Sequence, residues 1–105
     1  MMKHKEAFRR REQLASQLPP VAEILRGSLL QRTIRHKQGC PKCARGGGHP
    51  AWVLTVGYSG GINRQYSIRP ELVPQVRRWL RNYRELKAKL EAICESNHVF
   101  LRPEE

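Results

Sequence analysis

The chain has 105 residues, 39% of them hydrophobic and 7% aromatic, which fits one folding domain and leaves no room for a second independent core. Twenty Lys and Arg residues outweigh nine Asp and Glu, and the resulting net charge of +11 attracts anionic partners such as nucleic acid. No apolar run reaches the roughly 18 residues of a membrane span, and residues 8–11 lack the apolar stretch of a signal peptide. We therefore expect one soluble, cytoplasmic domain over residues 1–105, with no membrane partner.

The first predicted element is an amphipathic helix within residues 1–18. Apolar residues recur there at helical spacing between good helix formers, namely Ala7, Phe8, Leu14, Ala15 and Leu18. Pro19 and Pro20 end the helix, because proline has no N–H to donate and restricts the residue before it. Residues 21–25 are a candidate for one further helical turn before Gly27.

Residues 28–69 predict a small antiparallel sheet of two or three strands. Residues 28–35 alternate like a strand, with Leu30, Arg32 and Ile34 on one side and Leu29, Gln31 and Thr33 on the other, although a helix is an alternative. Residues 51–58 and 64–68 are two further strand-like runs, rich in β-branched and aromatic residues. Residues 59–63 between them predict a hairpin loop, in which Gly60 and Gly61 supply positive φ angles.

Residues 70–98 predict a long helix, which begins with Pro70 and Glu71 in its first turn and is followed by a tail over residues 99–105. Its apolar positions are separated by alternating steps of four and three: Leu72, Val76, Trp79, Tyr83, Leu86, Leu90, Ile93 and Asn97. This heptad seam packs either against the sheet and the N-terminal helix of the same chain or against a second copy. The bulk of Trp79 and Tyr83 favours the first arrangement. Cys94 is expected to pack as a small apolar residue.

The loop over residues 36–49 carries the pattern H-x3-C-x2-C-x5-H, whose ligand types are His36, Cys40, Cys43 and His49. Zinc prefers four tetrahedral thiolate and imidazole ligands, and a C-x2-C turn brings two thiolates to one ion. We expect a closed, structural Zn²⁺ site here. A redox-active Cys40–Cys43 pair is an alternative, but the glycines at 46–48 argue against the helix that such a pair would open.

Catalytic patterns are missing from the sequence. A four-ligand zinc site has no open position for water, and the chain contains no aspartate at all. Ser28, Ser59 and Ser67 have no neighbouring His and acid, and the glycine run lacks the ending of a phosphate-binding loop. We therefore expect no enzyme activity and no small-molecule substrate.

The basic residues are the main candidates for binding a partner, and fourteen of the twenty are arginines, which suit phosphate contacts and stacking. The candidate nucleic-acid contacts are Arg9, Arg10 and Arg11 on the first helix, Arg32, Arg35, Lys37, Lys42 and Arg45 around the loop, and Arg77, Arg81 and Arg84 on the long helix. A zinc ion would hold the loop cations in a fixed geometry. Trp52, Tyr58 and Tyr66 can offer stacking surfaces, although aromatic residues of a hairpin more often belong to the core.

Several segments resemble an uncharacterised family of short prokaryotic proteins over roughly residues 20–98: the run Arg26-Gly27-Ser28-Leu29, the Cys/His loop, His49-Pro50 before a strand, and the helix start at residues 70–73. In that family the loop carries C-x4-C-x-C followed by His-Gly-Pro. His36 stands here at the place of the first cysteine, Cys43 at that of the last, and Cys40 lies one residue earlier than the middle one. The resemblance implies a fold and a metal site but no activity.

Together these features predict an α+β fold with an N-terminal helix, a small antiparallel sheet with an inserted zinc loop, and a long C-terminal helix. The expected function is that of a non-catalytic zinc protein that binds DNA or RNA, or acts as an accessory factor in a nucleoprotein complex. The alternative is a protein-interaction adaptor or inhibitor that uses the long helix and the hairpin.

Overall fold

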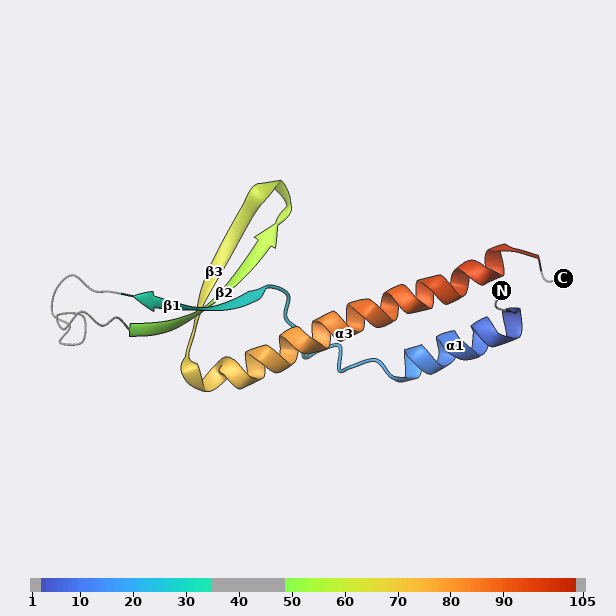
Figure 1. Cartoon of the computed structure of the whole chain (residues 1–105), viewed down its shortest axis with the longest axis horizontal. Helices are drawn as coiled ribbons and strands as arrows, with labels where there is room; N and C mark the ends of the chain where they lie inside the picture. Colours follow the sequence, from blue (N-terminus) through green and yellow to red (C-terminus); the bar gives the residue numbers. More distant parts are fainter. Residues whose placement is uncertain (1–2, 35–48, 104–105) are drawn as a thin grey trace. The chain divides into compact units, whose positions relative to one another are not determined.

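A computed structural model describes residues 3–34 and 49–103 of the chain, leaving aside the side chains of Ile34 and His49. The elements are α1 (His4–Ser16), β1 (Ser28–Ile34), β2 (His49–Tyr58), β3 (Ile62–Ile68) and α3 (Val73–His98), with short 3-10 turns at Ser59–Gly61, Pro70–Leu72 and Val99–Leu101 (Figure 1). The predicted α+β class and the order of its elements are confirmed. The predicted zinc loop lies outside the described residues, except for the backbone of His49.

The chain divides into two compact units. We call Leu25–Leu80 the sheet unit, and Met1–Ile24 together with Arg81–Glu105 the helix unit. Helix α3 contributes its first eight residues to the sheet unit and the remainder to the helix unit. That the whole chain folds as one domain stays a prediction. Within the described part of the chain, no helix is long and apolar enough to cross a membrane.

The three strands form one antiparallel sheet in the order β1-β2-β3. Strand β2 pairs Leu54 with Leu29 of β1 and with Tyr66 of β3. The strand prediction is therefore confirmed over the helix alternative for residues 28–34. The hairpin loop is shorter than predicted, because Tyr58 pairs with Ile62 and leaves only Ser59–Gly61 between them. Gly60 and Gly61 have φ angles of 82° and 76°, as the hairpin requires.

The core of the sheet unit lies between one face of the sheet and the first turns of α3. Leu54 and Val56 of β2 cluster with Val76 of α3, and the partly buried Leu25, Leu29, Ile68 and Leu80 pack around them. Side chains directly opposite each other in a sheet lie on the same face. The Leu29 side of β1 therefore faces the core, while Leu30 lies on the other face and is 46% exposed.

The helix unit is an antiparallel pair of α1 and the second part of α3, with its contacts ordered along both segments (Figure 1). At one end His4 Nε2 lies 2.8 Å from the carbonyl oxygen of Arg102, and farther along Arg11 Nη1 donates to Asn97 Oδ1 at 3.3 Å. The next segment continues the pair, since Asn82 Nδ2 donates to the Glu23 carbonyl oxygen. Residues 21 and 22 form a turn and residue 23 a bend there, instead of the candidate helical turn over residues 21–25.

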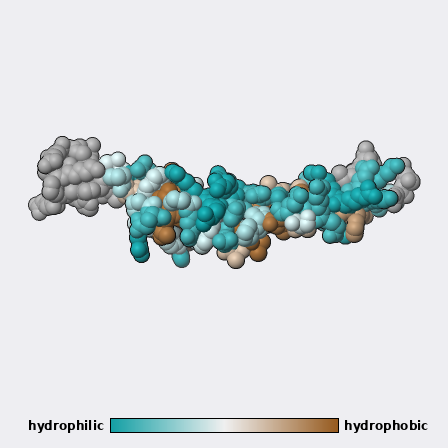
Figure 2. Space-filling model, turned by 90° about the horizontal axis from the view of Figure 1, so that it is seen from below, coloured by the Kyte–Doolittle hydropathy of each residue, from teal (hydrophilic) through white to brown (hydrophobic). Residues whose placement is uncertain are grey.

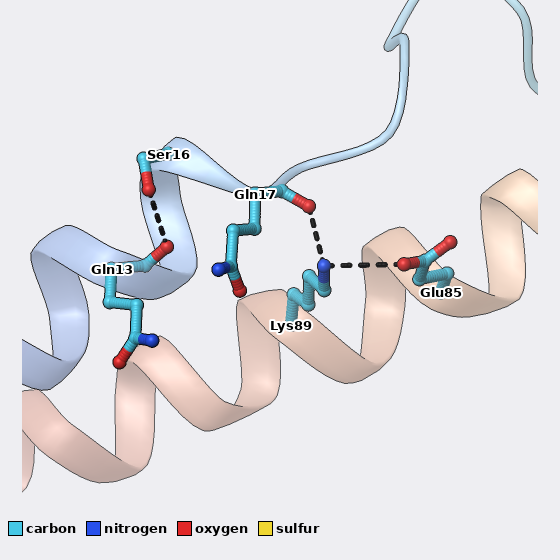
Figure 3. Close-up of polar contacts among 5 residues, drawn as sticks. All are labelled: Gln13, Ser16, Gln17, Glu85 and Lys89. Atoms are coloured by element: carbon cyan, nitrogen blue, oxygen red, sulfur yellow. Dashed lines mark hydrogen bonds and ion pairs between the residues drawn. The ribbon is translucent and has the colours of Figure 1, made fainter.

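Lys89 joins the end of α1 to α3 (Figure 3). Its Nζ donates to the Gln17 carbonyl oxygen at 2.5 Å and lies 3.2 Å from Glu85 Oε1. The last carbonyl groups of a helix have no partner within the helix and form the negative end of its dipole. The ammonium group of Lys89 therefore provides a hydrogen-bond donor to a carbonyl oxygen at the C-terminal end of α1. Ser16 Oγ donates to another carbonyl oxygen there, that of Gln13.

The heptad seam of α3 is buried within this single chain at several of its positions. Val76 and Leu86 are buried, Trp79, Tyr83, Ile93 and Asn97 are partly buried, and Leu72 and Leu90 are exposed. Part of the seam is therefore covered within the chain, and pairing with a second copy stays a prediction. The prediction that Cys94 is packed is wrong, because Cys94 is exposed. It follows Ile93 by one residue, which turns its side chain about a quarter of the way around the helix.

Candidate nucleic-acid interface

Positive charge is concentrated in the sheet unit. Its residues 25–80 contain ten Lys or Arg residues and a single acidic residue, Glu71, for a net charge of +9. The helix unit has the same number of basic residues, but eight glutamates reduce its net charge to +2. Most of the +11 therefore belongs to a unit of 56 residues, and an anion approaching it meets little opposing charge.

The two units also differ in whether their cations form ion pairs. In the helix unit Arg11 pairs with Glu12 at 3.5 Å and lies over the rings of Phe8 and Phe100, at 4.9 and 5.1 Å from their centroids. Lys89 pairs with Glu85. Among the described residues of the sheet unit there is no ion pair, and three arginines lie over aromatic rings instead. A ring orients a guanidinium without neutralising its charge.

One cluster of such contacts lies at the hairpin. We call Arg26, Tyr58, Ile62, Arg64 and Tyr66 the tyrosine–arginine patch. The guanidinium carbons of Arg26 and Arg64 lie 5.1 and 5.3 Å from the centroid of the Tyr58 ring. Arg26 Nη1 also donates to the Gly57 carbonyl oxygen at 2.6 Å. Two positive groups that come from different parts of the sequence are thus held at one tyrosine.

The register of the hairpin places these side chains on one face of the sheet. Arg64 is opposite Val56 and Tyr66 is opposite Leu54, so both share the face of β2 that packs against α3. Tyr58 and Ile62 form the last pair of the same face. The side chains of Tyr58, Ile62 and Tyr66 are 43%, 58% and 45% exposed, respectively. The patch is therefore open to solvent although its neighbours on the same strands are core residues.

Arg77, one of the predicted nucleic-acid contacts, lies over an aromatic ring of the sheet. It lies on α3 with its guanidinium carbon 5.0 Å from the centroid of the Trp52 ring. Trp52 is on the same face as Leu54, because the two are separated by two positions on β2. Hydrophilic side chains cover most of the face drawn in Figure 2, where hydrophobic side chains form only small, separate areas.

The other predicted contacts are dispersed. Arg9 and Arg10 are exposed on α1, whereas Arg11 is partly buried between the two rings of the helix unit. Arg81 and Arg84 are exposed in the helix unit. Arg32 is opposite Ala51, which places it on the sheet face away from Trp52. The predicted set therefore does not form one surface.

The remaining predicted residues cannot be placed on this surface. Those outside the described residues are Arg35, Lys37, Lys42 and Arg45, together with the zinc ligands His36, Cys40 and Cys43. His49 begins β2 opposite Ile34, and its side chain is not among those described. Over residues 3–34 and 49–103 there is no cluster of three His, Cys, Asp or Glu side chains that could hold a metal ion.

Arg26 and Arg64 were not among the contacts predicted from the sequence. The position of Arg64 could have been predicted, because the predicted hairpin places Arg64 on the same face of the sheet as Tyr58. A loop of five residues instead of three shifts the pairing by two positions, and such a shift leaves every side chain on its face. The contact of Arg26 with Tyr58 could not be predicted in this way, because Arg26 precedes β1 and its position depends on the backbone conformation before that strand.

Comparison with protein-family models matches residues 4–78 to a domain of unknown function, DUF6788. The chain belongs to the DUF6788 family. The match confirms the expected membership of an uncharacterised family and includes α1, the three strands and the start of α3, so the tyrosine–arginine patch lies within the DUF6788 domain. Neither the curated proteins nor the solved structures give a match to this chain.

Proposed function

We propose that this protein binds nucleic acid through its sheet unit, as a non-catalytic cytoplasmic protein or an accessory factor in a nucleoprotein complex. The observation that supports the proposal is the net charge of +9 in a unit where three of the described arginines lie over aromatic rings and none is paired with an acid. The helix unit, with its eight glutamates, serves as the comparison within the same chain.

The arrangement of the arginines favours phosphate over other anions. Each phosphate that a cation contacts releases counterions. A surface with many unpaired cations therefore binds a polyanion such as nucleic acid more tightly than it binds a single small anion. Arginine also forms bidentate bonds to phosphate oxygens, and its flat group keeps one face on the ring while its edge donates. The exposed edges of Arg26, Arg64 and Arg77 can therefore contact a backbone while Tyr58 and Trp52 hold them in place.

Binding should be measured by fluorescence anisotropy at low salt, with labelled single-stranded and double-stranded DNA and single-stranded RNA. We expect the double variant Arg26→Gln/Arg64→Gln to weaken binding by about tenfold and to reduce the salt dependence by the contribution of roughly two phosphates. The control is Arg9→Gln/Arg10→Gln, which removes the same charge from the helix unit and should have a smaller effect. Equal losses in the two variants would show that the sheet unit is not the preferred binding surface, and no binding to any probe would refute the function.

The second part of the proposal is a structural zinc ion held by His36, Cys40, Cys43 and His49. Support comes from the ligand spacing, and from the position of the loop between β1 and β2, where closing it would fix the ends of two paired strands. The cations Lys37, Lys42 and Arg45 on the same loop would offset the two thiolates.

Purified protein is expected to contain one zinc ion per chain by atomic emission. Cys40→Ser should lose the metal, because the remaining three ligands bind Zn²⁺ far more weakly than a complete tetrahedral set. Cys94→Ser is the matched control, since this exposed cysteine on α3 lies outside the predicted ligand set. A Cys40–Cys43 disulfide without metal in the purified protein would support the redox interpretation instead.

A further inference from the structure

The two tyrosines of the tyrosine–arginine patch have different surroundings. Two guanidinium groups lie over the ring of Tyr58. Among the described residues no guanidinium or ammonium group lies over the ring of Tyr66, which is 45% exposed. Tyr58 thus holds arginines, while Tyr66 presents an aromatic ring to solvent on the same face.

Tyr66 and Arg64 are close enough to act on one ligand. They are separated by two positions on β3, which places their backbones about 7 Å apart along the strand with both side chains on one face. Ile62 extends the exposed face by another two positions and is 58% exposed. Tyr66 and Ile62 thus form an exposed apolar area beside the unpaired positive charge of Arg64. Such a surface suits a ligand that has both a flat, uncharged part and phosphates.

We propose that the tyrosine–arginine patch binds single-stranded nucleic acid, with a base stacked on the ring of Tyr66 and neighbouring phosphates held by Arg26 and Arg64. This inference rests on the proposed function and specifies the class of nucleic acid. In a duplex the faces of the bases are covered by their neighbours, so Tyr66 has nothing to stack on and only the phosphate contacts remain. In a single strand the bases can turn outward onto an aromatic ring.

The exposed polar groups of the patch are two guanidinium groups, which contact phosphates in this arrangement, and two phenol hydroxyls. Stacking accepts every base, since each has a flat face. The patch should therefore distinguish single strands from duplexes without a strong sequence preference.

The test compares a labelled single-stranded DNA oligonucleotide with a duplex of the same length by fluorescence anisotropy at one salt concentration. We expect the protein to prefer the single strand, and Tyr66→Leu to weaken that binding by about tenfold, as for the loss of one base–aromatic stack. Tyr66→Phe keeps the ring and should retain the affinity. Gln65→Ala is the matched control, since Gln65 is the adjacent residue on β3 and faces the other side of the sheet. Circular dichroism should show the same melting profile for all variants.

The results separate this inference from the proposed function. If the protein binds both probes and Tyr66→Leu changes neither affinity, or weakens both equally, the stacking role of Tyr66 is wrong while nucleic-acid binding stands. If Tyr66→Leu leaves the single-strand affinity unchanged, this face of the sheet would instead be assigned to a protein partner. If the wild-type protein binds neither probe, the proposed function itself fails.

Discussion

Gly27→Ala is expected to lower the free energy of unfolding by about 3 kcal/mol, because two penalties act at this position. Gly27 has a φ angle of 139°, which side chains with a Cβ rarely adopt. A Cβ added there would lie 2.8 Å from the carbonyl oxygen of Thr55 and 3.1 Å from the side chains of Leu54 and Val56. The nearest atom is backbone of the central strand, so it cannot move aside without displacing the sheet.

Urea denaturation followed by circular dichroism measures this effect, and Gly60→Ala is its matched control. Gly60 also has a positive φ angle, at 82°, but a Cβ added there would meet no atom within 4 Å. Its substitution should therefore cost only the conformational penalty, about 1–2 kcal/mol. Equal losses in the two variants would show that crowding against Thr55 contributes nothing.

Leu54→Ala should cost about 2–5 kcal/mol, the range for removing a large side chain from a packed core. Leu54 is 4% exposed, lies at the centre of β2 and packs in the cluster with Val56 and Val76. The described core contains few such residues, and none of its large side chains is fully buried. The cavity therefore removes a substantial share of the apolar contacts that join the sheet to α3.

Leu30→Ala provides the comparison on the other face of the same sheet. Leu30 is 46% exposed, so its truncation removes little buried area and should cost less than about 1 kcal/mol. Both variants delete the same atoms from adjacent strands, and their melting curves can be measured side by side. A loss at Leu30 as large as that at Leu54 would mean that the second face is also part of the core.

The elements were predictable from local sequence, because each has a signal within a few residues. Pro19 and Pro20 follow the end of α1, the glycines at 60 and 61 mark the hairpin, and Pro70 begins the turn that leads into α3. These residues act on their own backbone, so no knowledge of the tertiary structure is needed. The heptad seam of α3 indicated a packing face, but the sequence left open whether the same chain or a second copy covers it.

The candidate site was less predictable, because it depends on contacts between distant parts of the chain. The charge clusters in the sequence pointed to Arg9–Arg11, but Arg11 is held between Phe8 and Phe100, and the latter lies at the far end of the sequence. Gly27 had no signal beyond its residue type, since the β2 atoms that would crowd an added Cβ come from a distant part of the sequence. The zinc ligands remain predictions, because their loop lies outside the described residues.

The antiparallel helix pair has a consequence for the order of folding. The contact of His4 with Arg102 joins residues 98 positions apart, whereas the hairpin pairs residues such as Tyr58 and Ile62 that are close in sequence. Closing a long loop costs more chain entropy than closing a short one, and α1 is synthesised before the helix that it pairs with. The hairpin should therefore form first, and α1 should remain without its tertiary contacts until α3 has been synthesised.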